Sequence, residues 1–542
     1  MIGAMKETIE NLIRQALTEL NLGEFKNVNF SVEHPTNMTF GDYSSNIALK
    51  ILPAGNVSDI VNWLKANQPP EIEKIEEKML FINFYLSKEF FKKSIGEIVE
   101  KGSEFGKNEN MKGEKVMVEH TDPNPFKSFH IGHLMPNIIG STLANIFEWN
   151  GAEVKQACYQ GDVGIHVAKA IWGMMAGSQE PYVFGNKKFE EDENVRKEIQ
   201  EINKKIYDRS DESINKLYDE GRKASLEYFD SIYKKLGSHF DYYFFESEAA
   251  PRGKKLVEEN TNKDGKKIFR SSTEEERYPI VFDGEMYDKN LHTRVFINSE
   301  GIPTYEAKEL GLAPMKFEKY PYTKSIVVTG NEVNAYFKVL LQALKLISPN
   351  LAEITKHIGH GMLRLPTGKM SSRTGEVTLA ETLIDGVKEK TKGDEAIAIG
   401  AIKYMILRQS IGNDIIFDIE KSVSTEGDSG VYLQYAYART CSILEKANMK
   451  GNASAERENI HEVEKLLYRF PEIVERASKE YSPNIITTYL TEIAGSFNNL
   501  YANEQIISDK PESAYLIALT RAFNIVMKNG LTILGIPTPE RM

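Results

Sequence analysis

A strand–loop–helix–strand pattern in the first third of the chain narrows the choice of folds more than any other segment. Residues 116–120 form a short apolar run, as in a buried strand, and a loop rich in Pro and Asn follows over 121–129. Apolar residues then recur at helical spacing from about 130 to 149, Gly151 ends this helix, and 154–159 again resembles a strand. Such a βαβ unit belongs to a parallel sheet, whose ligands bind beyond the carboxyl ends of the strands. The Pro/Asn loop lies at that edge.

Periodicity divides the chain into three parts. Residues 1–108 open with an amphipathic helix and continue with mixed patterns, which predicts a small α/β domain. Residues 109–426 contain the βαβ unit and predict a Rossmann-type α/β domain, interrupted by a charged helical insertion over about 186–280. We assign the aromatic run 240–245 to the core of this insertion. From 427 to 542 every periodic segment is helical, so an all-α domain is expected.

Charge and cysteine content exclude several classes of protein. The 67 Lys and Arg against 78 Asp and Glu give a net charge of −11, which argues against a basic, histone-like binder but leaves local RNA contact open. Two cysteines are too few for a disulfide framework or a structural zinc site, and they favour a cytoplasmic protein. No uncharged apolar run reaches the roughly 18 residues of a membrane span.

Two histidines mark the point where the loop becomes a helix, in the run His130-Ile131-Gly132-His133. A helix N-terminus presents free N–H groups to phosphate, and positions three apart share one face. His130 and His133 can therefore donate to phosphoryl oxygens, while Gly132 would let a flat base lie on the backbone. The alternative is an ordinary helix start with two partly exposed histidines.

A second basic motif follows roughly 240 residues later, in a Pro/Gly/Ser loop after a strand-like run. It reads Lys369-Met370-Ser371-Ser372-Arg373. A loop with Lys and Arg can close over a polyphosphate and stabilise charge on a leaving group. Alone it is equally compatible with a solvated basic turn. Both motifs, in this order, favour a nucleotide site.

The two motifs resemble the HIGH and KMSKS motifs of class I aminoacyl-tRNA synthetases, and other segments resemble arginyl-tRNA synthetases in particular. Residues 118–134 resemble the segment that leads into HIGH in that family, 160–164 its next block, and 37–49 its N-terminal additional domain. Three further segments resemble its helical tRNA-binding domain: 432–439, 496–501 and 528–542. The resemblance covers nearly the whole chain.

The resemblance implies ATP-dependent ligation of arginine to tRNA(Arg) through an arginyl-adenylate, with Mg²⁺ accompanying ATP. It implies a tRNA-contacting N-terminal domain over 1–108, a class I catalytic domain over 109–426 and an anticodon-binding domain over 427–542. A cytoplasmic monomer without zinc or a membrane contact is expected. Two alternatives stay open: another class I synthetase or nucleotidyl transferase, and a synthetase paralogue that binds RNA without charging it.

The resemblance also implies roles for the motif residues. ATP contacts are implied for seven of them: His130, Gly132, His133, Lys369, Met370, Ser371 and Ser372. His130 and His133 would hold the phosphates, and Lys369 would stabilise the α-phosphate and the leaving pyrophosphate. Ser372 replaces the second lysine of KMSKS, and Lys127 matches a family lysine that assists where that lysine is missing.

Four residues form the implied arginine pocket: Glu119, Asn124, Tyr305 and Glu309. Glu119 would meet the charged end of the substrate, and the last two lie four apart on a predicted helix over 303–312, hence on one face. The sequence departs from the family, which usually has Asp at Glu309 and has Gln and His where Val333 and Tyr336 stand. Glu332 is then a candidate for the missing acceptor.

No metal ligand is predicted from these motifs. His357 and His360 are spaced as a possible pair, but no cysteine or third ligand is near in sequence, so a structural role is expected. Asp162 is expected to order the loop near the ribose.

Overall fold

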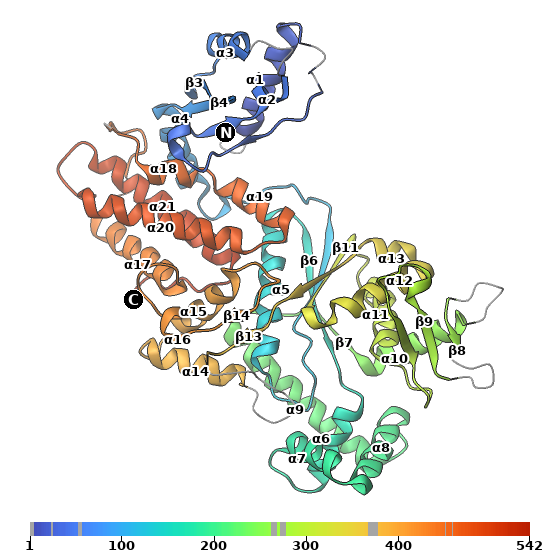
Figure 1. The fold of residues 1–542 in the computed structure, drawn as a ribbon. Helices are drawn as coiled ribbons and strands as arrows, with labels where there is room; N and C mark the ends of the chain where they lie inside the picture. Colours follow the sequence, from blue (N-terminus) through green and yellow to red (C-terminus); the bar gives the residue numbers. More distant parts are fainter. Residues whose placement is uncertain are drawn as a thin grey trace.

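The computed structural model shows three units in chain order (Figure 1). The structure describes all residues of the chain except 1–4, 23, 24, 26, 52–56, 262–267, 272–277, 367–377, 450 and 458. In Figure 1 the N-terminal unit lies at the top, a parallel sheet in the centre and a helical C-terminal unit to the left. The predicted fold class is thereby confirmed: a small α/β domain, a Rossmann-type domain with inserted helices, and an all-α domain.

The N-terminal unit is an antiparallel sheet of order β1–β2–β4–β3 packed against helices. Its elements are β1 Val32–Glu33, β2 Tyr43–Ser45, β3 Ile72–Lys78, β4 Phe81–Leu86, α1 Met5–Glu19, α2 Ile47–Ile51, α3 Val57–Ala66 and α4 Lys88–Lys101. The helical spacing of Ile9, Ile13 and Leu17 places all three in the core. The Tyr43 hydroxyl donates to Glu472 at 2.6 Å, so the unit is anchored to the C-terminal helices.

The central sheet is five-stranded, fully parallel and ordered β12–β11–β5–β6–β7. Its strands are β5 Lys115–Glu119, β6 Glu153–Gln160, β7 Tyr242–Phe245, β11 Lys324–Gly330 and β12 Thr355–His360. The predicted βαβ unit is β5, α5 Ile131–Trp149 and β6, as its periodicity indicated. All five strands end at one edge, where the Pro/Asn loop lies.

Helices cover both faces of this sheet. Helix α5 lies on one face and also contacts the C-terminal helices, which explains why most of its residues are buried. A Cβ at Gly140 would lie 2.3 Å from the His120 ring, so this glycine lets α5 approach the strand closely. On the other face lie α10 Glu246–Glu259, α11 Tyr305–Lys319, α12 Asn334–Ile347 and α13 Pro349–Glu353.

The predicted insertion is more varied than its sequence suggested. Three helices form a module at the bottom of Figure 1: α6 Ile165–Met175, α7 Pro181–Glu191 and α8 Glu193–Asp208. Helix α9 Glu212–Leu236 packs on this module with its first half and reaches the main core with its last turns. The expectation that 240–245 forms the insertion core is wrong, because β7 pairs with β6 as an outer strand of the main sheet. In the sequence this short aromatic strand directly follows a charged helical segment, so it was assigned to the same unit.

Smaller sheets and the remaining helices complete the chain. An antiparallel sheet contains β8 Arg270–Ser271, β9 Ile280–Asp283 and β10 Thr293–Ile297, and a parallel pair contains β13 Leu363–Arg364 and β14 Ile415–Ile416. The helices that follow are α14 Ala380–Lys390, α15 Glu395–Leu407, α16 Ile419–Ser422, α17 Gly430–Ala447, α18 Glu462–Leu467, α19 Phe470–Glu480, α20 Asn484–Asn503 and α21 Ser513–Ile533.

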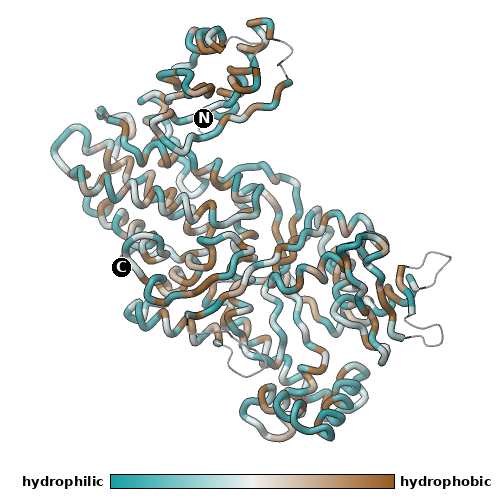
Figure 2. The backbone as a smooth tube through the Cα atoms, in the orientation of Figure 1, coloured by the Kyte–Doolittle hydropathy of each residue, from teal (hydrophilic) through white to brown (hydrophobic). Residues whose placement is uncertain are grey.

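Hydropathy follows this arrangement. Hydrophobic residues are frequent along the central sheet and along the C-terminal helices, whereas the inserted module is largely hydrophilic (Figure 2). The buried residues of the C-terminal helices belong to the main core cluster. Within the described residues, no helix combines the length and the apolar character that a membrane crossing needs.

Candidate active site

The HIGH-like residues form the cap of α5 at the carboxyl edge of the sheet. His130 is the N-cap: its Nδ1 accepts from the Gly132 N–H at 3.0 Å, and His133 Nδ1 accepts from the His130 N–H at 3.3 Å. The two rings stack with centroids 3.8 Å apart. Because each Nδ1 accepts a hydrogen bond, each neutral ring carries its proton on Nε2. Both rings can therefore donate outward from Nε2.

Burial sets the protonation state of these histidines. It lowers the pKa of His130 to about 4, with a smaller effect of the Lys127 charge, and lowers the pKa of His133 well below its usual value. Both rings are neutral donors at pH 7. A Cβ at Gly132 would lie 2.8 Å from the His130 ring, so the glycine is needed for the ring to fold onto the helix end.

Lys127 lies in the loop just before this cap. Its Nζ lies 4.8 Å from the centroid of the Tyr182 ring, which α7 contributes. Burial, with a smaller contribution from the charge of Lys169, lowers the pKa of Lys127 to about 8, and the charge of Glu246 acts in the opposite direction. The inserted module thus contacts the loop that carries this cation.

Four predicted ATP-binding residues, Lys369, Met370, Ser371 and Ser372, lie outside the described residues. The chain that follows them is described and meets the first motif. The Ile131 N–H donates to Thr378 O at 3.2 Å, and the Ala380 N–H donates to Phe129 O at 3.0 Å. The segment after the second motif is therefore hydrogen-bonded to the start of α5, a contact that sequence spacing alone did not reveal.

The two acids among the predicted arginine-binding residues, Glu119 and Glu309, lie near each other at this edge of the sheet. Glu119, at the end of β5, is 1% exposed, and its Oε2 accepts from Lys316 Nζ of α11 at 2.6 Å. Burial and then the Glu119 charge raise the pKa of Glu309, on α11, to about 8, while Lys316 acts in the opposite direction. Burial and Glu119 likewise raise the pKa of Asp122 well above its usual value. The sequence did not identify Lys316 or Asp122.

The other two predicted pocket residues lie around this cluster. A Cβ at Gly161 would lie 2.2 Å from Asn124 Oδ1, so Asn124 packs directly on the loop after β6. Tyr305 begins α11 and is 60% exposed, with Lys308 Nζ 5.3 Å from its ring centroid. Lys308 forms a buried ion pair with Glu246 at 2.6 Å, which the sequence also did not reveal.

The residues at and next to the positions where this sequence differs from the family lie in different surroundings. Tyr336 forms a side-chain hydrogen bond with Glu309, which lowers the pKa of this acid against the stronger effect of burial. Glu332 is exposed and folds back over Gly330. Burial lowers the pKa of His360, and the charge of Glu332 partly opposes this effect. Tyr336 is therefore the departure that contacts the acid cluster.

Asp162 and the two spaced histidines have structural partners. Asp162 accepts from the Tyr218 hydroxyl at 2.8 Å and the Ser247 hydroxyl at 2.7 Å, so it ties α9 to the loop after β6. His357 stacks on Phe337 with centroids 3.9 Å apart, and His360 contacts Gly361 O. In the described part of the chain no three His, Cys, Asp or Glu side chains converge as metal ligands.

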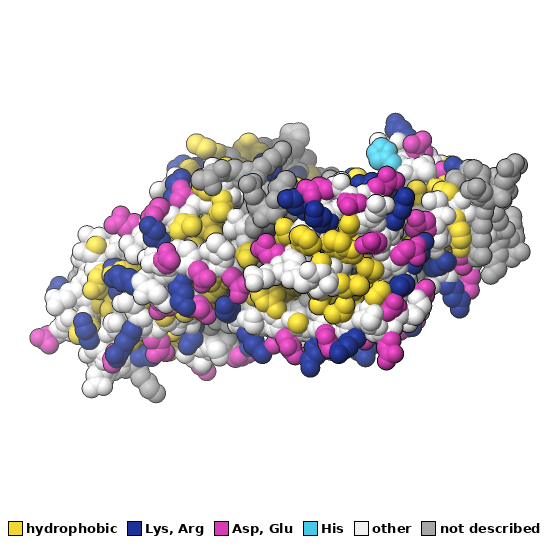
Figure 3. Space-filling view, turned by 90° about the horizontal axis from the view of Figure 1, so that it is seen from below, with side chains coloured by type: hydrophobic (Ala, Val, Ile, Leu, Met, Phe, Trp, Pro, Cys, Tyr) yellow, Lys and Arg dark blue, Asp and Glu magenta, His cyan; other side chains and the backbone are white. Residues whose placement is uncertain are grey.

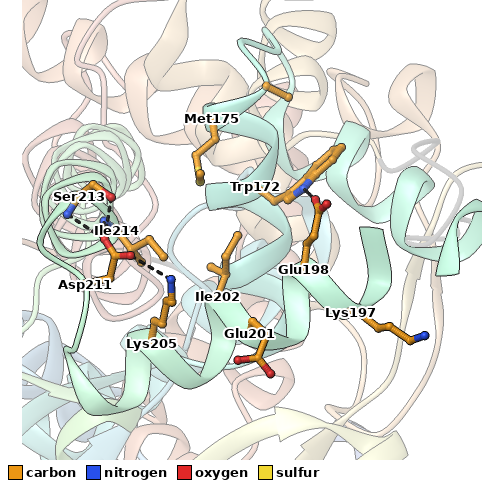
Figure 4. A pocket seen from close by; sticks show the side chains of 11 residues that line it. Trp172, Met175, Lys197, Glu198, Glu201, Ile202, Lys205, Asp211, Ser213 and Ile214 are labelled. Carbon is orange, nitrogen blue, oxygen red and sulfur yellow. Dashed lines mark hydrogen bonds and ion pairs between the residues drawn. The ribbon is translucent and has the colours of Figure 1, made fainter. Parts of the chain in front are cut away.

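A cavity of about 650 Å³ lies away from these residues, between α6, α8 and the start of α9 (Figure 4). Trp172 and Ile202 line it, and Lys205 pairs with Asp211 at its rim. Seen from below, apolar side chains gather at the centre of this end of the molecule within a ring of charged ones (Figure 3). None of the predicted site residues lines this cavity.

Comparison with known proteins places three family models along the chain. They are the Arginyl tRNA synthetase N terminal domain over 7–86, the tRNA synthetases class I (R) catalytic domain over 94–394, and the DALR anticodon binding domain over 433–542.

Whole-length relatives agree with these models. The chain is 30% identical to an arginine–tRNA ligase of Halothermothrix orenii, with 99% of each covered, and 30% identical to one of Streptococcus thermophilus, with 99% of this chain and all of the relative covered. Its fold matches the arginyl-tRNA synthetase of Thermus thermophilus with a TM-score of 0.73 and 23% sequence identity, over 99% of this chain and 100% of that one. It matches the arginyl-tRNA synthetase of Plasmodium falciparum with a TM-score of 0.76 and 19% identity, over 99% of each chain.

Proposed function

Because this chain belongs to the arginyl-tRNA synthetase family, we propose that the sheet edge around α5 carries out both steps of arginine–tRNA ligation. The enzyme is an arginine–tRNA ligase, which joins arginine to tRNA(Arg) at the expense of ATP. The observation that carries the assignment to this edge is the pairing of 129–131 with 378–380 above the Glu119–Glu309 cluster. This pairing supports a site built from both motifs.

In the first step, an arginine carboxylate oxygen attacks the α-phosphorus of ATP, and the bond to the bridging oxygen of pyrophosphate breaks. His130 and His133 would donate from Nε2 to phosphate oxygens, and Lys127 and Lys369 would balance the charge that develops on the leaving group. Gly132, Met370, Ser371 and Ser372 would line the nucleotide. Magnesium would be held by ATP phosphates and water rather than by a protein cluster.

Glu119 and Glu309 would bind the guanidinium, since planar N–H donors pair well with carboxylates. Lys316 occupies Oε2 of Glu119, which leaves Oε1 for the substrate. Asn124 and Tyr305 would flank the arginine from the loop and from the first turn of α11. In the second step, the 2′-hydroxyl of the terminal adenosine attacks the arginyl carbonyl, and AMP leaves.

The outer domains would bind the tRNA. Residues 1–108 and 427–542 flank the catalytic domain 109–426. On the helical unit, the Arg439 guanidinium lies 4.6 Å from the ring centroid of Tyr435 and 5.2 Å from that of Tyr501, and both tyrosines are exposed. Exposed aromatic and guanidinium planes suit stacking of unpaired RNA bases. We further propose a cytoplasmic monomer.

A charging assay tests the function. Purified enzyme, ATP and total tRNA are incubated with each of the twenty amino acids and with citrulline. Arginine alone should be charged efficiently, and lysine and citrulline should be much poorer substrates, because the ammonium of lysine lacks the planar donors of a guanidinium and citrulline carries no charge to pair with the acids. Charging of another amino acid would favour a different class I synthetase, and RNA binding without charging would favour the inactive paralogue.

A further inference from the structure

Tyr159 has a buried hydroxyl group that has no role in the reaction proposed above. It lies near the carboxyl end of β6, and its ring, 6% exposed, packs in an apolar cluster with Met117, Phe244 and Leu312. Its backbone N–H donates to Asp122 Oδ1 at 2.7 Å. The ring is thereby fixed on the face of the sheet that α11 covers.

The Tyr159 hydroxyl has no hydrogen-bond partner among the described residues. A buried hydroxyl of this kind is uncommon in native proteins, because it has lost its hydrogen bonds to water without replacement. A packing role alone would be filled at least as well by phenylalanine. The hydroxyl group therefore points to a partner that enters from outside the chain.

The charges around the hydroxyl indicate what that partner is. After burial, the carboxylates of Glu246, Glu309 and Glu119 are the groups that raise the pKa of Tyr159 most. Glu246 is already paired with Lys308. The geometry agrees with this: β6 pairs with β5, which ends at Glu119, and Leu312, which packs in the same cluster as Tyr159, is three residues from Glu309 on α11. The hydroxyl therefore lies within electrostatic range of the two acids proposed for the guanidinium, and it remains protonated at neutral pH.

We propose that Tyr159 is a specificity-determining residue whose phenol oxygen accepts a hydrogen bond from the guanidinium of the arginine substrate. This inference rests on the proposed function. A guanidinium has five N–H donors, and two carboxylates that each bind it through both oxygens take at most four. With Oε2 of Glu119 held by Lys316, fewer carboxylate oxygens are free, so a neutral acceptor beside them satisfies a donor that would otherwise stay unpaired.

The test compares Tyr159→Phe with Tyr320→Phe. Tyr320 belongs to the same apolar cluster and is also 6% exposed, but its hydroxyl donates to Glu153 O at 3.1 Å. Without ligands, Tyr159→Phe should melt at or above the wild-type temperature, because it removes an unpaired hydroxyl, whereas Tyr320→Phe should melt lower. Isothermal titration with L-arginine should show about tenfold weaker binding for Tyr159→Phe and unchanged binding for Tyr320→Phe.

Charging kinetics separate this role from structural damage. Tyr159→Phe should raise the KM for arginine about tenfold and leave kcat within about twofold, as expected when one uniform binding contact is lost. A wild-type KM and a wild-type arginine affinity in Tyr159→Phe would overturn the inference. If the wild-type enzyme itself failed to charge arginine, the proposed function would be refuted instead, so the two failures are distinguishable.

Discussion

Arginine affinity should rise with pH between 6 and 8, because Glu309 must lose a proton before it can bind a guanidinium. In the unliganded enzyme, burial and then the charge of Glu119 raise the pKa of Glu309 to about 8. At pH 7 only about one-tenth of Glu309 is then ionised, and ionising the rest costs about 1.4 kcal/mol of binding free energy. Below the pKa, each unit of pH lowered should weaken apparent affinity about tenfold, so binding at pH 6 should be about a hundredfold weaker than on the alkaline plateau.

Isothermal titration in buffers of different ionisation enthalpy measures both the affinity and the protons released. Close to one proton should be released per arginine bound at pH 6, and about half a proton at pH 8, where half of Glu309 is already ionised. Glu309→Gln should bind more weakly and lose the pH slope, whereas Glu332→Gln, which changes an exposed acid near His360, should keep it. An affinity that is constant from pH 6 to 8, with no proton release, would show that Glu309 is ionised in the free enzyme and refute the reasoning.

Three further outcomes concern cations and the helix cap. Lys127→Ala should slow adenylate formation and leave arginine affinity nearly unchanged, and Ser372→Lys should partly restore its rate; an unaltered turnover rate would exclude a role for Lys127. His130→Ala should lower the charging rate about a hundredfold with a native circular dichroism spectrum, and near-wild-type turnover would contradict the phosphate role. Lys316→Met should reduce the free energy of unfolding by about 3–5 kcal/mol in urea titrations, since it leaves Glu119 buried and unpaired, and adding Glu119→Gln should recover most of that loss.

Local periodicity was sufficient to predict the part of the fold that carries the first motif. The apolar run before the loop, the helical spacing after His130 and the end at Gly151 each depend on neighbouring residues, and together they specify β5, α5 and β6. The strand β7 was missed because four aromatic residues between charged helices carry no distinct period, and only pairing with β6 identifies them as a strand.

The electrostatic partners could not be predicted for a different reason. Lys316 and Glu119 are 197 residues apart, and nothing in the sequence distinguishes this lysine from the other cations of α11. Burial of the ammonium depends on where α11 crosses the sheet, which is a property of tertiary packing. The same holds for Tyr159: the sequence predicts a strand over 154–159, but not that the hydroxyl of this tyrosine is buried without a partner among the described residues.

Four carboxyl groups lie close together at the carboxyl edge of the sheet, and their charges are balanced before a substrate binds. Glu119 and Glu246 are each neutralised by a lysine of α11, and burial favours the protonated forms of Asp122 and Glu309. An incoming guanidinium should replace a proton and not a lysine, because a buried ammonium that loses its carboxylate is left uncompensated at a greater cost than deprotonating an acid whose pKa is near 8. Citrulline carries no charge and cannot stabilise the ionised form of Glu309, so it should bind without releasing a proton. The preference for arginine over citrulline then comes from the ionisation of Glu309 that arginine binding drives. This preference should become smaller as the pH falls below 7, because ionising Glu309 then costs more.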